Sequence, residues 1–331
     1  MTKLFTKTIL ISYFFLLIIL FKLGLPTISE EIPLMQKNDY FNFSTIYSSV
    51  NNGRLAVTGN LIRYISPSYF EFFFIMNFII LGVIYFGYNI LRNKKNNIQI
   101  LNLFFLTFVL SPSFSNIFLN IRNLEVLFIL PLFFLFFIEY KVKHVVFFHY
   151  IIYFLLLNYL LYFKETIAFS LILYYLSLFF FRKSLFNKFF LYFGLFFCAI
   201  YLLIYLNIFF ENNQNSLILN KALTINENYI LNRVSIFLRY LFNDFVLLSF
   251  LIFFSFKWII LITKKKYLRL NSLFPISFCL GFLFIHIFIG VYGHYLVVLY
   301  PILMIILMHN HTFHINQNVI LTIVFLNLFF I

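Results

Sequence analysis

The sequence predicts an all-α protein, a polytopic integral membrane helix bundle of about eleven transmembrane helices with a cytoplasmic N-terminus. Of the 331 residues, 63% are hydrophobic and only 10% are charged, whereas a water-soluble domain carries about 25% charged residues. Apolar runs of about 20 residues, long enough to cross a bilayer, recur along the chain. No soluble segment is long enough to bury a core of its own, so we expect residues 1–331 to form a single transmembrane domain.

The individual helices are predicted from these apolar runs. Backbone groups at membrane depth must be hydrogen-bonded internally, so each span is expected to be a helix. The first run has no small-residue cleavage site after it and is interpreted as a retained anchor. Several runs, most clearly the third, tenth and eleventh, are shorter than the roughly 17–25 residues of a clean span. In order, the predicted helices are 9–25, 69–91, 100–110, 124–138, 145–163, 166–181, 189–210, 234–262, 273–291, 295–308 and 319–331.

Lys and Arg predict the orientation, because cytoplasmic loops of membrane proteins are enriched in them. With the N-terminus in the cytoplasm, 14 of the 24 Lys and Arg fall in cytoplasmic segments and seven in exterior ones. Every cytoplasmic loop up to Arg269 then carries a basic cluster. The acids show the opposite bias, with only Glu139 cytoplasmic and Asp244 in the outer part of its span. Acid, base or metal chemistry is therefore expected on the exterior side.

Composition and motifs exclude several classes of function. The net charge of +14 lies in loops between apolar runs, so the expected partner is the lipid bilayer and not nucleic acid. The cytoplasmic loops are short and contain no Walker or dinucleotide-binding glycine pattern, which argues against nucleotide-driven chemistry. Cys198 and Cys279 both lie inside apolar runs, so no disulfide is expected.

The first exterior loop, 26–68, is the longest and is the first candidate site. Asp39 could act as a base or ligate a divalent cation, Mg²⁺ or Mn²⁺, the one possible cofactor. Arg54 and Arg63 could hold a phosphate, because a guanidinium group matches phosphate oxygens in a bidentate fork. The alternative is a solvated loop in which Asp39 caps an interfacial helix.

Two further candidates lie at exterior helix ends. Arg122 and Glu125 are three residues apart and could pair on one helix face, either within a site or as a salt bridge that ends a span. Lys164 and Glu165 form an extremely short hairpin between two apolar helices. Charges so close to membrane depth are costly and are often functional, although Lys164 could instead extend to the membrane surface from a plain turn.

The remaining candidates are less specific. His294, between Gly293 and Tyr295, could contact a phosphate or a sugar, or could simply belong to the aromatic belt at the membrane interface. The Asn-rich exterior loop 211–233 could cover a site. Asp244 is an isolated candidate for a proton relay inside a span.

Several short stretches resemble the polytopic membrane glycosyltransferases of the C type, closest to the bacterial branch that modifies O-antigen and other surface glycans. The similarity extends broadly over the topology, but the motifs themselves are short. They are Asn38-Asp39-Tyr40, Gly53-Arg54-Leu55, Pro67 before a second span that contains Asn77, and Gly293-His294-Tyr295 followed by Tyr300-Pro301.

This resemblance implies catalysis at the exterior face of a bacterial inner membrane, with a polyprenyl-phosphate-linked sugar as donor and a glycan as acceptor. By position, Asp39 would deprotonate the acceptor hydroxyl or position the donor. Arg54 and Arg63 would hold the lipid phosphate, with Arg122 and Lys164 as further cations, and Glu165 would lie near the donor head group. Glu125 and His294 would support the site. Many relatives carry two adjacent acids in the first loop, whereas Asn38 precedes Asp39 here.

Two other functions stay open. A repeat-unit polymerase of O-antigen or exopolysaccharide is also a charge-poor protein of many spans that acts outside, and the stretch 120–125 resembles a segment of some exopolysaccharide polymerases. A lipid-linked glycan flippase or another transporter would catalyse no bond chemistry. A flippase should line its cavity with several charges inside its spans, and few are present here, mainly Lys22, Asp244 and Arg239.

Overall fold

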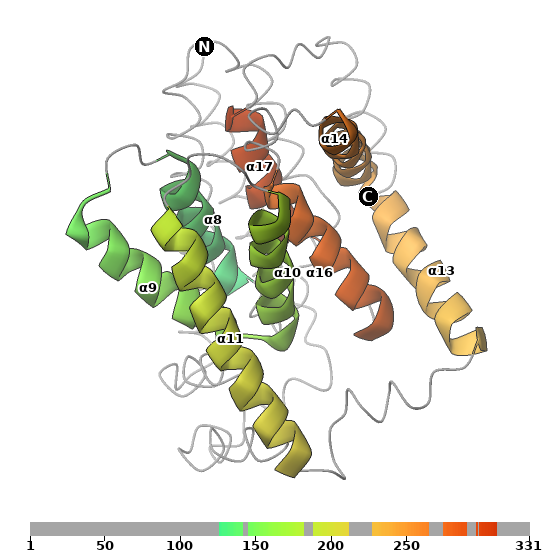
Figure 1. The fold of residues 1–331 in the computed structure, drawn as a ribbon. Coiled ribbons are helices and arrows are strands. Elements are labelled where there is room, and N and C mark those ends of the chain that lie inside the picture. Colours follow the sequence, from blue (N-terminus) through green and yellow to red (C-terminus); the bar gives the residue numbers. More distant parts are fainter. Residues whose placement is uncertain are drawn as a thin grey trace, which may run out of the picture.

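The computed structural model describes residues 126–141, 145–181, 188–211, 227–264, 274–289, 296 and 298–309 (Figure 1). Within these residues the protein is helical and contains no strand. The all-α class is thereby confirmed for this part of the chain. The helices are α8 (Val126–Lys141), α9 (Phe147–Leu161), α10 (Glu165–Phe181), α11 (Lys188–Glu211), α13 (Glu227–Asn243), α14 (Phe245–Thr263), α16 (Pro275–Ile289) and α17 (Leu299–His309).

Most of the predicted helices in this part of the chain are confirmed. The predicted runs 124–138, 145–163, 166–181, 189–210, 273–291 and 295–308 correspond in order to α8, α9, α10, α11, α16 and α17. Proline supports two of these boundaries: Pro275 is the first residue of α16 and Pro301 lies in the first turn of α17, where a missing N–H costs no helix bond. The predicted helices 9–25, 69–91, 100–110 and 319–331 lie outside the described residues.

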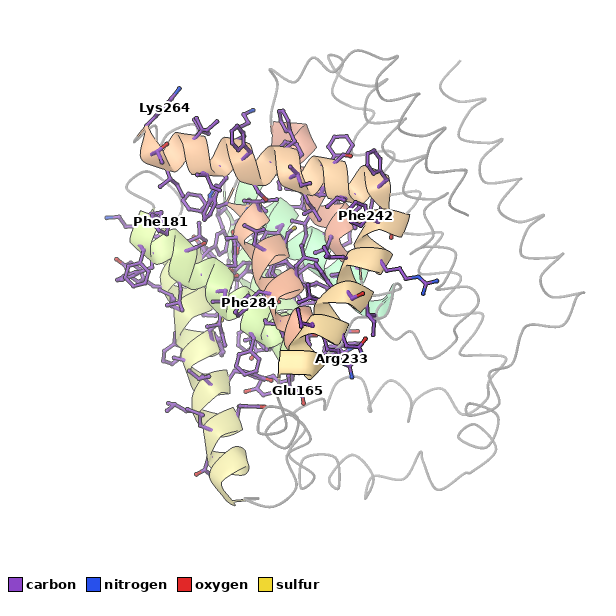
Figure 2. All side chains as sticks on the ribbon, turned by 90° about the vertical axis from the view of Figure 1, so that its right-hand side faces the viewer. Glu165, Phe181, Arg233, Phe242, Lys264 and Phe284 are labelled. Carbon is purple, nitrogen blue, oxygen red and sulfur yellow. The ribbon has the colours of Figure 1, made fainter. Side chains whose placement is uncertain are left out.

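One prediction is wrong: the run 234–262 is not a single helix. The chain leaves the helical conformation at Asp244, where φ is −98° and ψ is 58°, and α14 begins at the next residue. Asparagine and aspartate favour such breaks, because their side chains compete for backbone hydrogen bonds, and Asn243 and Asp244 stand side by side here. Both views show α14 lying across one end of the bundle and not along it (Figures 1 and 2).

Helix α10 is the centre of the described bundle. It packs against α9, α11 and most extensively α16. Two glycines allow close approach: a Cβ atom added to Gly194 of α11 would lie 2.5 Å from Cε1 of Tyr175, and one added to Gly281 of α16 would lie 2.9 Å from Cδ1 of Leu173. Small residues let helix backbones approach closely in the same way in membrane bundles. Between α10 and α16, the Ser177 hydroxyl also donates a hydrogen bond of 2.8 Å to that of Ser277.

The outer faces of these helices are as apolar as the core. On α9, Phe147 and Leu155 are 78% and 59% exposed, and on α11, Phe196 and Leu203 are 59% and 67% exposed. Among the described helices, α11 alone is long and apolar enough to cross a bilayer, over the 20 residues Lys188–Asn207, with a mean hydropathy of 2.3. Five shorter apolar helices of 10–17 residues accompany it.

Candidate functional site

The candidate site begins at the tight turn that joins α9 to α10. The backbone N–H of Tyr162 donates to Asn158 O at 3.1 Å, which closes the end of α9. The carbonyl oxygen of Lys164 then accepts bonds from the N–H groups of Ile167 and Ala168, at 3.0 and 3.1 Å, as α10 starts. Glu165 is the first residue of α10. Its carboxyl group therefore lies at the helix end whose N–H groups carry partial positive charge.

Among the described residues, three buried polar atoms around this turn are found with no hydrogen-bond partner. They are Oε1 of Glu165, Oγ1 of Thr166 and the phenolic oxygen of Tyr201. Glu165 is 9% exposed, Thr166 3% and Tyr201 0%. Leaving such a group unpaired costs about 1–3 kcal/mol, and native proteins retain few of them without a reason. Three such atoms close together make the turn and the adjoining part of α11 the candidate site for a polar ligand.

Two aromatic rings contact the ring of Tyr201, that of Tyr162 at the end of α9 and that of Tyr205 on α11. The rings of Tyr162 and Tyr201 meet edge to face with centroids 5.5 Å apart, and Tyr205 stacks against Tyr201 at 6.2 Å. Glu165 lies close enough to both Tyr201 and Tyr205 to act on them electrostatically. We refer to the whole group as the Glu165 site, which comprises Tyr162, Lys164, Glu165, Thr166, Tyr201 and Tyr205.

The Glu165 site lies just beneath the surface at one end of the bundle. Tyr162 and Lys164 are partly exposed, whereas Thr166 and Tyr201 beneath them are buried. Figure 2 shows Glu165 at the same end as Arg233 of α13, and Lys264 at the opposite end. The Glu165 site is therefore separated from Lys264 by the length of the apolar bundle.

Only two of the site residues predicted from the sequence belong to the described part of the chain. Lys164 and Glu165 are adjacent at the turn, as the short hairpin predicts, and the structure adds Thr166 and Tyr201 to them. The other predicted site residues lie outside the described residues: Asp39, Arg54, Arg63, Arg122, Glu125 and His294. The described residues contain no group of three or more His, Cys, Asp or Glu that could hold a metal ion.

A second polar cluster surrounds Glu139, which the sequence predicts on the cytoplasmic side, just after the helix 124–138. Helix α8 instead continues to Lys141, so Glu139 lies within the helix and is buried to 6% exposure. The hydroxyls of Tyr153 and Tyr175 donate to its Oε1 at 2.7 and 2.8 Å, and that of Tyr174 donates to Oε2. The sequence did contain a signal for this cluster: several tyrosines lie within apolar runs, and a buried tyrosine needs a hydrogen-bond partner for its hydroxyl group.

The Glu139 cluster joins several helices. Its members come from α8, α9 and α10, and the hydroxyls of Tyr153 and Tyr175 lie 2.5 Å apart. Tyr153 also lies 3.3 Å from the carbonyl oxygen of Phe190 on α11. Both carboxyl oxygens of Glu139 accept bonds from the protein itself, so this cluster acts as an internal brace. In the Glu165 site, in contrast, the Oε1 atom of Glu165 can accept a hydrogen bond from a ligand.

Asp244 also differs from its predicted position within a continuous span. It is 1% exposed at the break between α13 and α14, and its Oδ1 lies 3.4 Å from the hydroxyl of Tyr300 on α17. In Figure 2, Phe242 lies toward the α14 end of α13, away from Arg233. Asp244 therefore lies at the junction of α13 and α14, close to α17.

Comparison with known proteins adds no relative. No protein-family model matches the chain, and no curated protein or solved structure matches it either. The chemistry of the site must therefore be argued from its own groups: a carboxyl acceptor, two hydroxyls and a lysine at the end of an apolar bundle.

Proposed function

We propose that the protein is a membrane glycosyltransferase. It moves a sugar from a polyprenyl-phosphate donor to a surface-glycan or lipid-linked acceptor, at the exterior face of the bacterial inner membrane. The observation that carries the proposal is the Glu165 site, where a lysine and an unpartnered carboxyl oxygen meet at one end of an apolar bundle. A sugar attached to a lipid phosphate needs a cation for its phosphate and a hydrogen-bond acceptor for its hydroxyl groups, both near the end of the apolar bundle.

Membrane insertion is supported by the outer faces of the helices. Large apolar side chains stand exposed along α9, α11 and α14, including Phe147, Leu203 and Phe256 at 58% or more. A monomeric protein in water rarely exposes such extensive apolar surface, whereas lipid tails cover it without cost. The polar groups within the bundle, such as Glu139, face its interior, as ionisable groups do inside membranes.

The proposed reaction is a displacement at the anomeric carbon of the donor sugar. The acceptor hydroxyl oxygen forms the new glycosidic bond, the bond to the phosphate oxygen breaks, and the lipid phosphate leaves with the electron pair. Asp39 takes the proton of the acceptor hydroxyl. Lys164, with Arg54, Arg63 and Arg122, stabilises the charge on the departing phosphate. A divalent cation, Mg²⁺ or Mn²⁺, would assist at the same phosphate.

The test is mass spectrometry of the surface glycan and its lipid-linked precursor, in cells with and without this protein. A transferase predicts the loss of one sugar or side branch from a glycan that is otherwise polymerised normally. Accumulation of single complete repeat units would instead identify a polymerase and end the transferase proposal. An unchanged glycan and precursor would end both.

Asp39→Asn tests the proposed base. The amide cannot accept the proton, so we expect glycan modification to fall by about 100-fold or more, while the amount of folded protein in the membrane stays the same. Full modification in this variant would remove Asp39 from the mechanism. Glu71→Gln, a substitution at an acid that is assigned no role, is the matched control.

A further inference from the structure

The three unpartnered atoms of the Glu165 site specify the chemistry of what binds there. An ionised carboxyl oxygen can only accept a hydrogen bond, whereas the hydroxyls of Thr166 and Tyr201 can donate and accept. A ligand that satisfies all three must therefore carry at least one hydrogen-bond donor beside further polar oxygens. A phosphate offers acceptors alone once it is fully ionised, so it cannot donate a hydrogen bond to Oε1 of Glu165.

The aromatic rings next to these atoms further limit the kind of ligand that fits the site. The ring of Tyr201 contacts that of Tyr162 edge to face and that of Tyr205 in a stacked arrangement, with centroid distances of 5.5 and 6.2 Å. Such rings present apolar surface to the C–H groups of a ligand, while the hydroxyl and carboxyl groups take its polar edge. A ring that carries both C–H faces and hydroxyl edges matches this combination, and Lys164 next to it can serve an adjoining phosphate.

We propose that Glu165, Thr166 and Tyr201 form the subsite for the sugar ring of the lipid-linked donor, with Glu165 accepting hydrogen bonds from ring hydroxyls. The inference rests on the proposed function and adds to it which residues recognise the sugar. Lys164, one residue before Glu165, contacts the phosphate. Tyr162 and Lys164 are partly exposed, so the ring approaches the buried groups past these two side chains.

The variants that test the subsite are Tyr201→Phe and Glu165→Gln, with Tyr192→Phe as the matched control. Tyr192 is on the same helix as Tyr201 but is 58% exposed. Removing an unpaired buried hydroxyl relieves a cost in the empty protein. Tyr201→Phe should therefore raise the apparent Tm of the ligand-free protein by about 2 °C, while the control leaves it unchanged. A loss of Tm in Tyr201→Phe would mean that its hydroxyl is already paired, and would overturn the subsite.

Binding is measured on the full chain in detergent, as the rise in apparent Tm with synthetic short-chain probes. The probes are citronellyl phosphate alone and the same lipid phosphate carrying glucose, galactose, mannose or N-acetylglucosamine. At least one sugar-bearing probe should raise the Tm more than citronellyl phosphate does. This excess should vanish in Tyr201→Phe and Glu165→Gln and persist in Tyr192→Phe.

Two results would refute the subsite. Either no sugar adds to the effect of the bare lipid phosphate, or the excess survives in both subsite variants. Neither result alters the glycan analysis in cells, which tests the transferase proposal separately. Conversely, a normal glycan in cells without the protein would remove the transferase proposal even if sugar binding at Glu165 were observed.

Discussion

At the scale of single residues, the two buried glutamates differ in what surrounds them. Glu139 receives hydroxyl donors on both of its oxygens, whereas Oε1 of Glu165 receives none. A carboxyl group that is fully paired within the protein stabilises the fold and leaves nothing for a ligand. Glu139 is therefore interpreted as structural and Glu165 as functional, although both are acids near helix ends.

Tyr174→Phe tests the structural role of Glu139. The substitution removes the donor to Oε2 and leaves the ring in place beside Phe136, whose centroid is 4.9 Å away. The buried carboxyl group then loses one of its hydroxyl donors, so we expect a loss of about 1–3 kcal/mol in the free energy of unfolding. Thermal unfolding in detergent measures it, with Tyr192→Phe as the exposed control. Equal stability of the two variants would rule out the brace.

The sequence predicts these residues unequally. Lys164 and Glu165 could be found because two charges interrupt a long apolar stretch at a turn. Glu139 could not be placed, because it lies two residues before Lys141 and resembles the start of a basic loop. Its partners are 14 to 36 residues away in sequence. Tyr201 looks like any other tyrosine of an apolar helix until the fold places it beside Glu165.

At the scale of helices, the contact between α10 and α11 depends on one glycine. The space that a side chain would need at Gly194 is filled by the ring of Tyr175, which is completely buried and bonded to Glu139. At Gly281, the neighbouring atom is the end of Leu173, a flexible side chain that is 41% exposed. The two glycines therefore differ in how well their neighbours can move.

Gly194→Ala and Gly281→Ala form a matched pair for this contact. The added methyl group at Gly194 meets a ring that cannot move without breaking the Glu139 cluster, so we expect a loss of about 1–3 kcal/mol in stability. At Gly281, Leu173 can turn outward, and the loss should be clearly smaller. Thermal unfolding of both variants in detergent compares the two losses as changes in apparent Tm. If both alanines cost the same, the buried position of Tyr175 does not set the spacing of α10 and α11.

The helices themselves follow from apolar runs, but their directions do not. Hydrophobicity continues from the end of α13 into α14 with Asp244 alone between them, so the run was predicted as one long span. The break depends on the burial of Asp244 beside Tyr300, which is 56 residues away. A contact between distant segments of this kind leaves no periodic signal in the sequence, whereas the span boundaries at Pro275 and Lys188 do.

At the scale of the whole molecule, the described bundle has two different ends and an apolar outer surface. The Glu165 site and Arg233 lie at one end, and Lys264 lies at the other (Figure 2). The sequence predicts that the first end lies outside the cell and the second in the cytoplasm, because cytoplasmic loops are enriched in Lys and Arg. The proposed chemistry requires this arrangement, since a lipid-linked sugar is used at the exterior face.

Cysteine labelling in intact cells tests the arrangement directly. The natural Cys198 and Cys279 are buried at 3% and 0% exposure, so a membrane-impermeant maleimide should leave the parent protein almost unlabelled. Lys164→Cys should react from outside, because its position is partly exposed at the exterior turn. Lys264→Cys should react only after the membrane is permeabilised.

The pattern of labelling separates the possible failures. Reaction of Lys264→Cys alone in intact cells would invert the orientation and place the Glu165 site in the cytoplasm, where a lipid-linked donor at the exterior face cannot reach it. Reaction of both variants in intact cells would mean that no membrane separates the two ends of the bundle. The exposed apolar side chains would then have to be buried by something other than lipid. Only exterior access at Lys164 with protection at Lys264 keeps the site on the side where the proposed transfer takes place.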